Sequence, residues 1–197
     1  MAMPAIQRRW TAADVRELTR EDRAWPRYEV IDGELLVTPS PRSAHYFACV
    51  ELVKLLDAYL DREPVGVAAM SPADIELLPD NITQPDVFVV PWETTLVGDT
   101  LQWSDVKSLL LAAEVLSPSS LRTDRLEKRV FYLKNGVEEY WIVDLDAQVL
   151  ERWLPGRETP RLFREEVVWS PRGRDPLVID LPAYFARIDA KLRRFRR

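Results

Sequence analysis

The sequence predicts an α/β fold, in which helices flank a mixed β-sheet. Several strand patterns precede residue 109, one helix pattern separates the apolar run 109–116 from the apolar run 138–144, and further strand patterns follow. This order is typical of mixed sheets. The runs 87–90 and 140–143 are apolar on both faces, as central strands are. A length of 197 residues with 47% hydrophobic content favours one domain over residues 1–197.

Capping and turn residues predict the first elements. Thr11 and Asp14 are typical of the first turn of a helix, which we expect over residues 11–23. Asp32 and Gly33 supply the positive φ angles of a two-residue turn. This turn should join the two strands of a hairpin, 28–31 and 35–38.

A long amphipathic helix is predicted over residues 43–60. Its apolar side chains recur at helical spacing and should pack on the sheet. They are Tyr46, Val50, Val53, Leu56 (or Asp57) and Leu60, with Leu52, Leu55 and Tyr59 widening the stripe. Cys49 lies in this pattern and is interpreted as a buried core residue. As the one cysteine of the chain, it excludes disulfides within the chain and zinc sites built from several thiolates.

The remaining strands follow from runs of apolar or alternating residues. Asp74 and Glu76 alternate with apolar neighbours, as on a half-exposed strand. The expected strands are 65–70, 73–78, 87–90, 109–116, 138–144, 148–153, 162–169 and 177–179. A second helix is expected over residues 122–135, ended by Gly136.

One acidic residue stands out in the run 109–116. Glu114 shares a period-2 face with Leu110, Ala112 and Leu116, so its carboxylate should face a packed layer. An unpaired buried carboxylate costs several kcal/mol, roughly, so Glu114 needs a cation, a metal ion or hydrogen-bond donors. Asp86, at the mouth of a neighbouring apolar strand, could share a cation with it.

Composition excludes several classes of protein. The six glycines are scattered, which removes Rossmann and P-loop nucleotide sites, and one histidine, His45, leaves little for a Ser-His-Asp triad or a zincin site. A net charge of −5 argues against coating nucleic acid non-specifically. The segment 187–197 is strongly basic, and we leave open whether it is a solvated terminus or a phosphate-contacting tail. No membrane span or signal peptide is recognised, so a cytoplasmic protein is expected.

Five short motifs, in order, resemble the Uma2 family of nucleases in the PD-(D/E)XK, restriction-endonuclease-like superfamily. The resemblance covers about residues 27–154. The motifs are Tyr28-Glu29-Val30-Ile31-Asp32-Gly33-Glu34-Leu35, His45, Gln84-Pro85-Asp86-Val87, Glu114-Val115-Leu116-Ser117-Pro118-Ser119 with Asp124, Lys128 and Tyr132, and Gly136-Val137 with Glu139-Tyr140-Trp141-Ile142-Val143-Asp144.

The resemblance implies a metal-dependent endonuclease. Asp86 and Glu114 would coordinate Mg²⁺ or Mn²⁺, which favours hard oxygen ligands. The ion would polarise a phosphodiester bond of DNA and activate a water molecule. Cutting two strands favours two sites, so a homodimer is expected by analogy.

The chain departs from the superfamily at the motif lysine. The superfamily has a lysine two residues after the acidic residue, where this chain has Leu116. Lys128 is the best replacement for a catalytic role, reaching in from the following helix. Leu126, Val130 and Leu133 form the clearest apolar stripe of that helix, however, and Lys128 lies nearly opposite them. The alternative is therefore that Lys128 forms an ordinary surface pair with Asp124.

Two rival functions remain open from the sequence. Leu116 at the lysine position favours a nuclease-like domain that has lost catalysis and binds nucleic acid or protein. An inert interaction domain is a third interpretation, which leaves the apolar setting of Glu114 unexplained. Second-tier candidates for the site are Glu34, Glu29, His45 and Tyr132, although hairpin glutamates are usually exposed.

Overall fold

A six-stranded mixed sheet forms the centre of the protein. The computed structural model describes residues 9–19, 25–95, 102–118 and 120–195. The strands lie in the order β3-β4-β5-β6-β7-β8, where β5 and β6 are parallel and the other neighbours antiparallel. Their bounds are β3 Gly66–Met70, β4 Val87–Pro91, β5 Leu111–Val115, β6 Tyr140–Asp144, β7 Val149–Trp153 and β8 Arg161–Phe163. The predicted mixed sheet, with a central β6, is confirmed.

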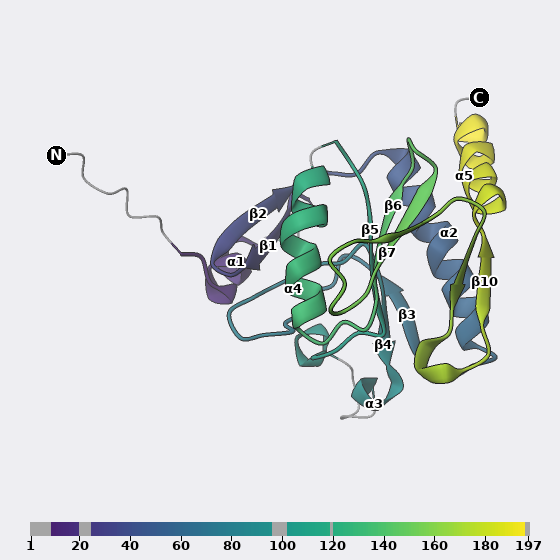
Figure 1. Cartoon of the computed structure of the whole chain (residues 1–197). Helices are drawn as coiled ribbons and strands as arrows, with labels where there is room; N and C mark the ends of the chain where they lie inside the picture. Colours follow the sequence, from purple (N-terminus) through teal and green to yellow (C-terminus); the bar gives the residue numbers. More distant parts are fainter. Residues whose placement is uncertain (1–8, 20–24, 96–101, 119, 196–197) are drawn as a thin grey trace.

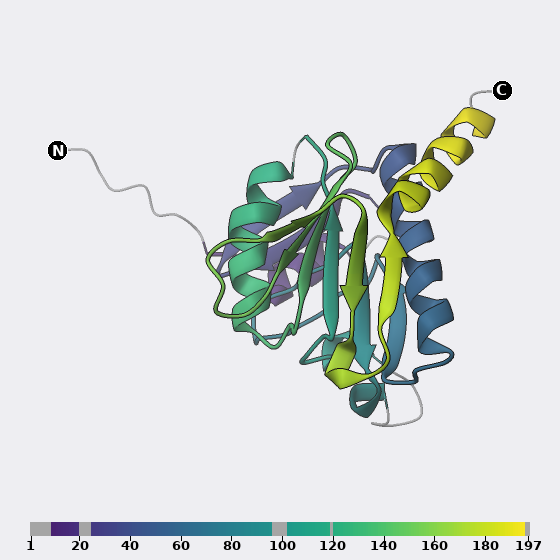
Figure 2. The ribbon, with the colours of Figure 1, turned by 45° about the vertical axis from the view of Figure 1, so that its right-hand side comes forward.

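Helices cover both faces of this sheet. The helices α2 (Ser43–Leu60) and α5 (Leu181–Phe195) lie on one face, and α4 (Arg129–Lys134) lies on the other (Figure 1). Figure 2 shows the sheet between these layers. Apolar side chains of α2 and α5 form one core with the strand residues that point to them, while Phe131 and Tyr132 of α4 belong to a second core. The predicted arrangement of two helices flanking the sheet is therefore confirmed.

A separate hairpin and a short helix precede the central sheet. The strands β1 (Arg27–Ile31) and β2 (Glu34–Thr38) pair with each other, and Ile31 faces Glu34 across the turn. Asp32 and Gly33 have φ angles of 51° and 86°, as the predicted two-residue turn requires. Thr11 caps α1 (Ala12–Leu18) in a reciprocal capping box with Asp14. Residues 20–23 of the expected helix lie outside the described residues.

The shorter elements complete the chain. They are α3 (Trp92–Thr95), two 3₁₀ turns (Trp103–Asp105 and Pro171–Gly173), a π-helical segment (Thr123–Lys128) that runs into α4, and a second two-stranded sheet of β9 (Glu166–Trp169) and β10 (Leu177–Asp180). None of the described helices is both long enough and apolar enough to cross a membrane.

Two strand predictions were wrong. Residues 73–78 keep the expected alternation, with Ile75 and Leu77 buried, but pair only through one bridge from Ile75 to Thr83. Pro72 and Pro79 flank this segment and cannot donate hydrogen bonds to a longer ladder. The expected strand 162–169 is divided between β8 and β9, because the chain turns between them and β9 pairs with β10 instead.

The basic C-terminal segment is not a free tail. Residues 187–195 form the second half of α5, where Ile188 is buried and Leu192 packs on the main core. Arg187 Nε lies 3.3 Å from Glu51 Oε2, and Lys191 also pairs with Glu51 on α2. This segment therefore docks part of α5 onto α2, while Arg193 and Arg194 are exposed and residues 196–197 lie outside the described residues. Whether its basic side chains are simply solvated or contact phosphate stays a prediction.

The buried stripes of the two flanking helices also differ from the expected ones. On α2, Tyr46 is exposed, and the buried side chains are Ala48, Cys49, Glu51, Leu52, Leu56, Tyr59 and Leu60. In the helical segment that ends with α4, Leu126 and Val130 are exposed by 51% and 39%. The side chains buried there are Asp124, Lys128, Phe131 and Tyr132.

Candidate active site

The two motif acids meet across neighbouring strands. Asp86 directly precedes β4, and Glu114 lies in β5. Because Val87 pairs with Ala113 in this antiparallel ladder, Asp86 continues the ladder opposite Glu114. Their exposed fractions are 4% and 2%. The backbone N–H of Val115 donates to Asp86 Oδ2 over 3.0 Å, which ties the two strand ends together.

Asp86 is held as a carboxylate by two side chains from different layers. Arg27, the first residue of β1, donates from Nη2 to Oδ1 over 2.8 Å. His45, in the first turn of α2, lies with Nε2 at 2.8 Å from Oδ2. Burial alone would raise the pKa of Asp86, but His45 and Arg27 outweigh it and hold this pKa well below its usual range. Asp86 is therefore ionised and His45 Nε2 is the donor.

Lys128 lies between two buried glutamates. Its Nζ is 2.9 Å from Glu114 Oε1 and 2.9 Å from Glu29 Oε2. The hydroxyl of Tyr132 donates to the same Glu114 oxygen over 3.3 Å. Glu29 in turn accepts the backbone N–H of Gln84 at Oε1 over 2.8 Å, so the hairpin is bonded to the segment that carries Asp86.

The electrostatics of this pair reflect an acidic environment. Burial alone would lower the pKa of Lys128, but Glu114 and Glu29 raise it well above its ordinary value, so the ammonium stays charged. Burial raises the pKa of Glu114 well above its ordinary value, and Asp86 adds to the effect while Lys128 opposes it. Glu114 is therefore the carboxylate whose charge most needs a further cation.

Lys128 reaches the cluster from the polar face of the helical segment that runs into α4. Asp124 and Lys128 lie in the π-helical segment, and Tyr132 follows one turn later in α4. Single π-helical turns occur frequently at functional sites. With 2% and 5% of their surfaces exposed, Asp124 and Lys128 do not form the surface pair considered as an alternative. Phe131 and Tyr132 are buried beside them, so the aromatic side chains, rather than the aliphatic stripe, determine which face packs on the sheet.

Asp124 adds a fourth buried carboxylate. Burial raises its pKa to about 6, against the opposing charge of Lys128 and a hydrogen bond from Ser120. The hydroxyl of Tyr140 on β6 donates to the backbone carbonyl of Asp124 over 3.0 Å, which fixes this helical turn on the sheet. Asp124 thus supplies negative charge close to Lys128 from the same helix.

A count of charges tests whether a metal ion fits this site. In this cluster the described buried carboxylates are those of Glu29, Asp86, Glu114 and Asp124, and the described buried permanent cations are those of Arg27 and Lys128. When all four acids are ionised and His45 is neutral, the cluster carries two excess negative charges, which is unfavourable in a buried site. The donors of Asp86 and Glu114 are carboxylate oxygens, which suit Mg²⁺ and Mn²⁺. A divalent cation therefore fits both the charge and the chemistry of this cluster.

His45 links the site to the core of α2. Cys49 lies one helical turn after His45, with Sγ 3.7 Å from His45 Nδ1. Cys49 is 2% exposed and packs in the main core, as predicted. Burial raises the pKa of its thiol well above the usual value. Ligand atoms of His45, Cys49 and Asp86 lie within 4.8 Å of one another and could also hold a metal ion.

The structure gathers most of the predicted site residues and one that was missed. Glu29, His45 and Tyr132 all contact the cluster, although Glu29 was expected to be exposed as a hairpin residue and is only 1% exposed. Glu34 is exposed beside the hairpin turn and has no contact with the cluster among the described interactions. Arg27 was not identified as a site residue from the sequence. The available signal was its position two residues before Glu29, on the same face of a strand.

Comparison with known proteins identifies the family. The model of the Uma2 family, described as "Putative restriction endonuclease", matches residues 12–177. A crystal structure described as a "putative nuclease belonging to DUF820", from Anabaena variabilis, is similar with a TM-score of 0.70 and 20% sequence identity, covering 88% of this chain and 98% of that chain. This likeness confirms the predicted restriction-endonuclease-like fold. None of the curated proteins compared with the chain matches it. Since the family model spans most of its length, the chain belongs to the Uma2 family.

Proposed function

We propose that this protein is an endonuclease that hydrolyses phosphodiester bonds of DNA with the help of Mg²⁺ or Mn²⁺. The observation that carries the proposal is the buried pair of strand-end carboxylates, Asp86 and Glu114, with the ammonium of Lys128 bonded to one of them. When its four acids are ionised, the cluster has two more negative than permanent positive charges, which one divalent cation would balance. Membership in a family described by restriction endonucleases supports nucleic acid as the substrate class.

Each residue has a distinct task in this proposal. Asp86 and Glu114 would hold the cation, which when bound supplies a polarised phosphodiester and a water molecule of lowered pKa. Lys128 presents a permanent positive charge beside Glu114, where it can stabilise charge that develops on the phosphate. Glu29 keeps the flexible side chain of Lys128 in place through the second ion pair. The ammonium of Lys128 would thus supply the positive charge that Leu116, at the position of the motif lysine, cannot provide.

The choice of DNA and the oligomeric state belong to the proposal as well. The restriction-endonuclease description of the family supports DNA as the substrate. The homodimer stays a prediction, which rests on the need to cut two strands. The inactive binding module loses its main support, because Lys128 occupies the acidic cluster despite the leucine at the motif position.

A cleavage assay tests the proposal. Purified protein is incubated with supercoiled plasmid, single-stranded DNA and RNA, in the presence of Mg²⁺, Mn²⁺ or a chelator, alongside the Glu114→Gln variant. We expect DNA to be cut only with a divalent cation and the variant to be inactive. The same cations should raise the melting temperature of the wild type more than that of the variant. Cleavage that survives in Glu114→Gln, or a wild type that cuts no nucleic acid with any cation, would contradict the proposal.

A further inference from the structure

The carboxylate of Asp86 has little acceptor capacity left. Its Oδ2 receives two donors, the backbone N–H of Val115 at 3.0 Å and Nε2 of His45 at 2.8 Å. A carboxylate oxygen offers about two lone-pair sites, so Oδ2 is filled. The remaining site lies on Oδ1, which Arg27 Nη2 already contacts at 2.8 Å. Any cation that binds Asp86 therefore has to approach the oxygen held by the guanidinium of Arg27.

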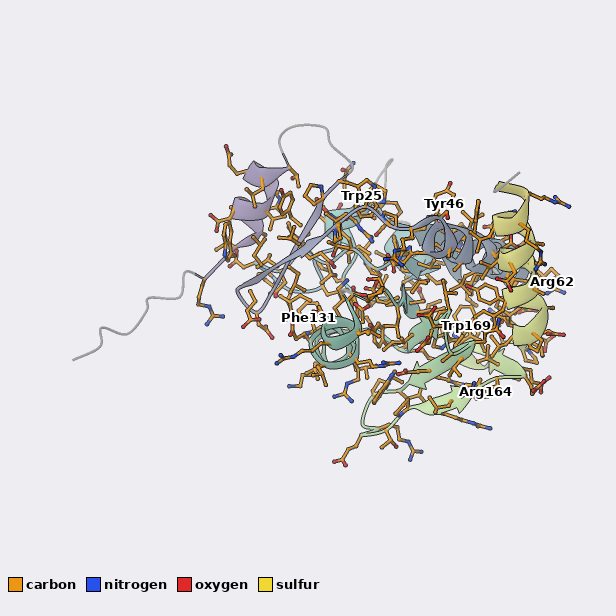
Figure 3. All side chains as sticks on the ribbon, turned by 90° about the horizontal axis from the view of Figure 1, so that it is seen from above. Trp25, Tyr46, Arg62, Phe131, Arg164 and Trp169 are labelled. Atoms are coloured by element: carbon orange, nitrogen blue, oxygen red, sulfur yellow. The ribbon has the colours of Figure 1, made fainter. Side chains whose placement is uncertain are left out.

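Arg27 is held less completely than a purely structural arginine would be. Its Nη1 reaches the carbonyl of Gln84 at 3.3 Å, near the upper limit for a hydrogen bond. Its Nε is buried and has no hydrogen-bond partner. The guanidinium also lies over the ring of Trp25, with Cζ 4.6 Å from the ring centre. Viewed from above (Figure 3), Trp25 lies between the hairpin and α2. The contact with Asp86 is therefore the strongest that Arg27 makes among the described residues.

We infer that Arg27 and the divalent cation compete for Asp86, and that the guanidinium released by the cation binds a phosphate of the nucleic acid. This inference rests on the proposed function. A cation at Oδ1 would repel the adjacent guanidinium, because like charges a few ångströms apart disfavour each other in a buried site. The planar fork of arginine matches two phosphate oxygens, which makes phosphate the natural new partner.

If Arg27 exchanges Asp86 for a phosphate, binding of the divalent cation and binding of the nucleic acid become coupled. Without a cation, Arg27 neutralises Asp86 and the guanidinium is unavailable to the substrate. With a cation bound, Arg27 becomes a free positive charge beside the site and nucleic acid binds more tightly. By linkage, nucleic acid then also strengthens binding of the cation. A structural role for Arg27 predicts the opposite sign, since loss of the arginine would disorder Asp86 and weaken cation binding.

A Mn²⁺ titration without nucleic acid separates the two roles. The free ion is followed by its electron paramagnetic resonance signal for the wild type, Arg27→Met and Arg27→Gln. We expect both variants to bind Mn²⁺ more tightly, by about tenfold, as the removal of one nearby positive charge implies. Arg125→Met is the matched control. Arg125 also pairs with buried or half-buried acids, Glu151 at 2.9 Å and Asp144 at 3.3 Å, outside the proposed metal ligands. It should leave the Mn²⁺ affinity unchanged.

Thermal unfolding accompanies the titration. Without metal, we expect Arg27→Met and Arg27→Gln to have lower melting temperatures than the wild type. Addition of Mn²⁺ should raise the melting temperatures of the variants by more than that of the wild type. Mn²⁺ affinity that is unchanged or weaker in both variants would overturn the inference. It would do so whether or not the wild type cuts DNA. Absence of Mn²⁺ binding in the wild type and in both variants would overturn it together with the proposed function.

A second measurement tests the transfer of Arg27 to phosphate. Binding of a fluorescein-labelled DNA duplex is measured by anisotropy in the Lys128→Ala background, where cleavage should be slow compared with the measurement. We expect Mn²⁺ to strengthen duplex binding severalfold in Lys128→Ala and to have little effect in Lys128→Ala with Arg27→Met. Equal strengthening in both would overturn the role of Arg27 at the phosphate. A protein that shows tighter Mn²⁺ binding in Arg27→Met but never cuts DNA would refute the nuclease while leaving the competition intact.

Discussion

The helices on the two faces of the sheet differ in how many charged side chains they bury near the candidate site. On α2, residues such as Leu52, Leu56 and Tyr59 are buried in a continuous apolar core. The helix that ends with α4 buries Asp124 and Lys128 and leaves Leu126 half exposed. Apolar burial stabilises a fold directly, whereas buried charges stabilise it only when they are fully paired. Most of α2 thus packs in the apolar core, with His45 of its first turn reaching Asp86, whereas the other helix contributes Asp124 and Lys128 to the buried charged cluster.

The helix that ends with α4 can bury a lysine because the acidic cluster surrounds its ammonium with carboxylates. Lys128 is kept in the interior by Glu114 and Glu29, two charges from two separate sheets. Replacing such a cluster by apolar residues of similar volume is often neutral or stabilising, so stability alone does not explain why it is present. Perturbed carboxylates gathered with one lysine are typical of catalytic sites. Substitutions on the two helices should therefore differ in their effects on stability and on cleavage.

The largest expected effect is on stability, at Leu56 of α2. Leu56 is completely buried, so Leu56→Ala should remove about 2 to 5 kcal/mol from the free energy of unfolding. Leu126→Ala is the matched control on the other helix. Because Leu126 is half exposed and alanine is also a good helix former, it should change stability by less than about 0.5 kcal/mol. Urea unfolding followed by circular dichroism measures both, and comparable losses in the two variants would refute the contrast.

The fold could largely be predicted from the sequence because its signals are local. The bounds of α2 follow from helical periodicity over eighteen residues, and the hairpin follows from the turn chemistry of Asp32 and Gly33. The strand expected over 73–78 failed because pairing depends on distant partners, which alternation does not specify. The strand over 162–169 failed for the same reason, since β9 pairs with β10.

The site could be predicted only in part. Glu114 was found because a carboxylate in an apolar strand needs a partner, and Asp86 because of its place before a buried strand. A helical wheel shows two faces of the segment with Lys128 but not which one packs on the sheet, so the role of Lys128 stayed open. Glu29 and Arg27 reach the cluster from the hairpin, which forms a sheet of its own. Strand alternation puts both residues on one face of the hairpin, but their burial depends on how that sheet docks, which alternation does not specify.

The second prediction concerns the lysine that distinguishes the polar helix. Lys128→Ala should lower the rate of DNA cleavage by roughly 10²-fold or more, as the loss of one transition-state charge contact does. Glu29→Gln keeps the lysine but removes one of its two ion pairs, so we expect a smaller loss, about tenfold, from poorer positioning. Single-turnover cleavage kinetics at saturating Mg²⁺ measure both.

Two controls sharpen this result. Leu126→Ala, on the exposed face of the same helix, should cleave at the wild-type rate. Glu34→Gln, on the same hairpin as Glu29 but exposed, should also be unaffected. A Lys128→Ala variant that retains most of the activity would show that the site works without a lysine. Equal losses in Glu29→Gln and Glu34→Gln would show that the hairpin acts in some way other than through Lys128.

The smallest expected effect is a pH dependence of stability that arises from Asp124 on the polar helix. Asp124 has a pKa raised to about 6 by burial, so the folded protein binds a proton that the unfolded chain releases above about pH 4. That proton favours the folded state, and its contribution is lost as pH rises through about 6. Relative to Asp124→Asn, the wild type should therefore lose about 1 kcal/mol of stability between pH 5 and pH 7 without metal. Thermal unfolding of both proteins across this range, with a chelator present, measures the difference. Saturating Mn²⁺ should shrink it, because a nearby cation favours the ionised form of Asp124 and so lowers the pKa that burial raises. A difference that stays constant from pH 5 to pH 7 would mean that Asp124 is already ionised in the folded protein, and that Arg27 and Lys128 suffice to balance the cluster.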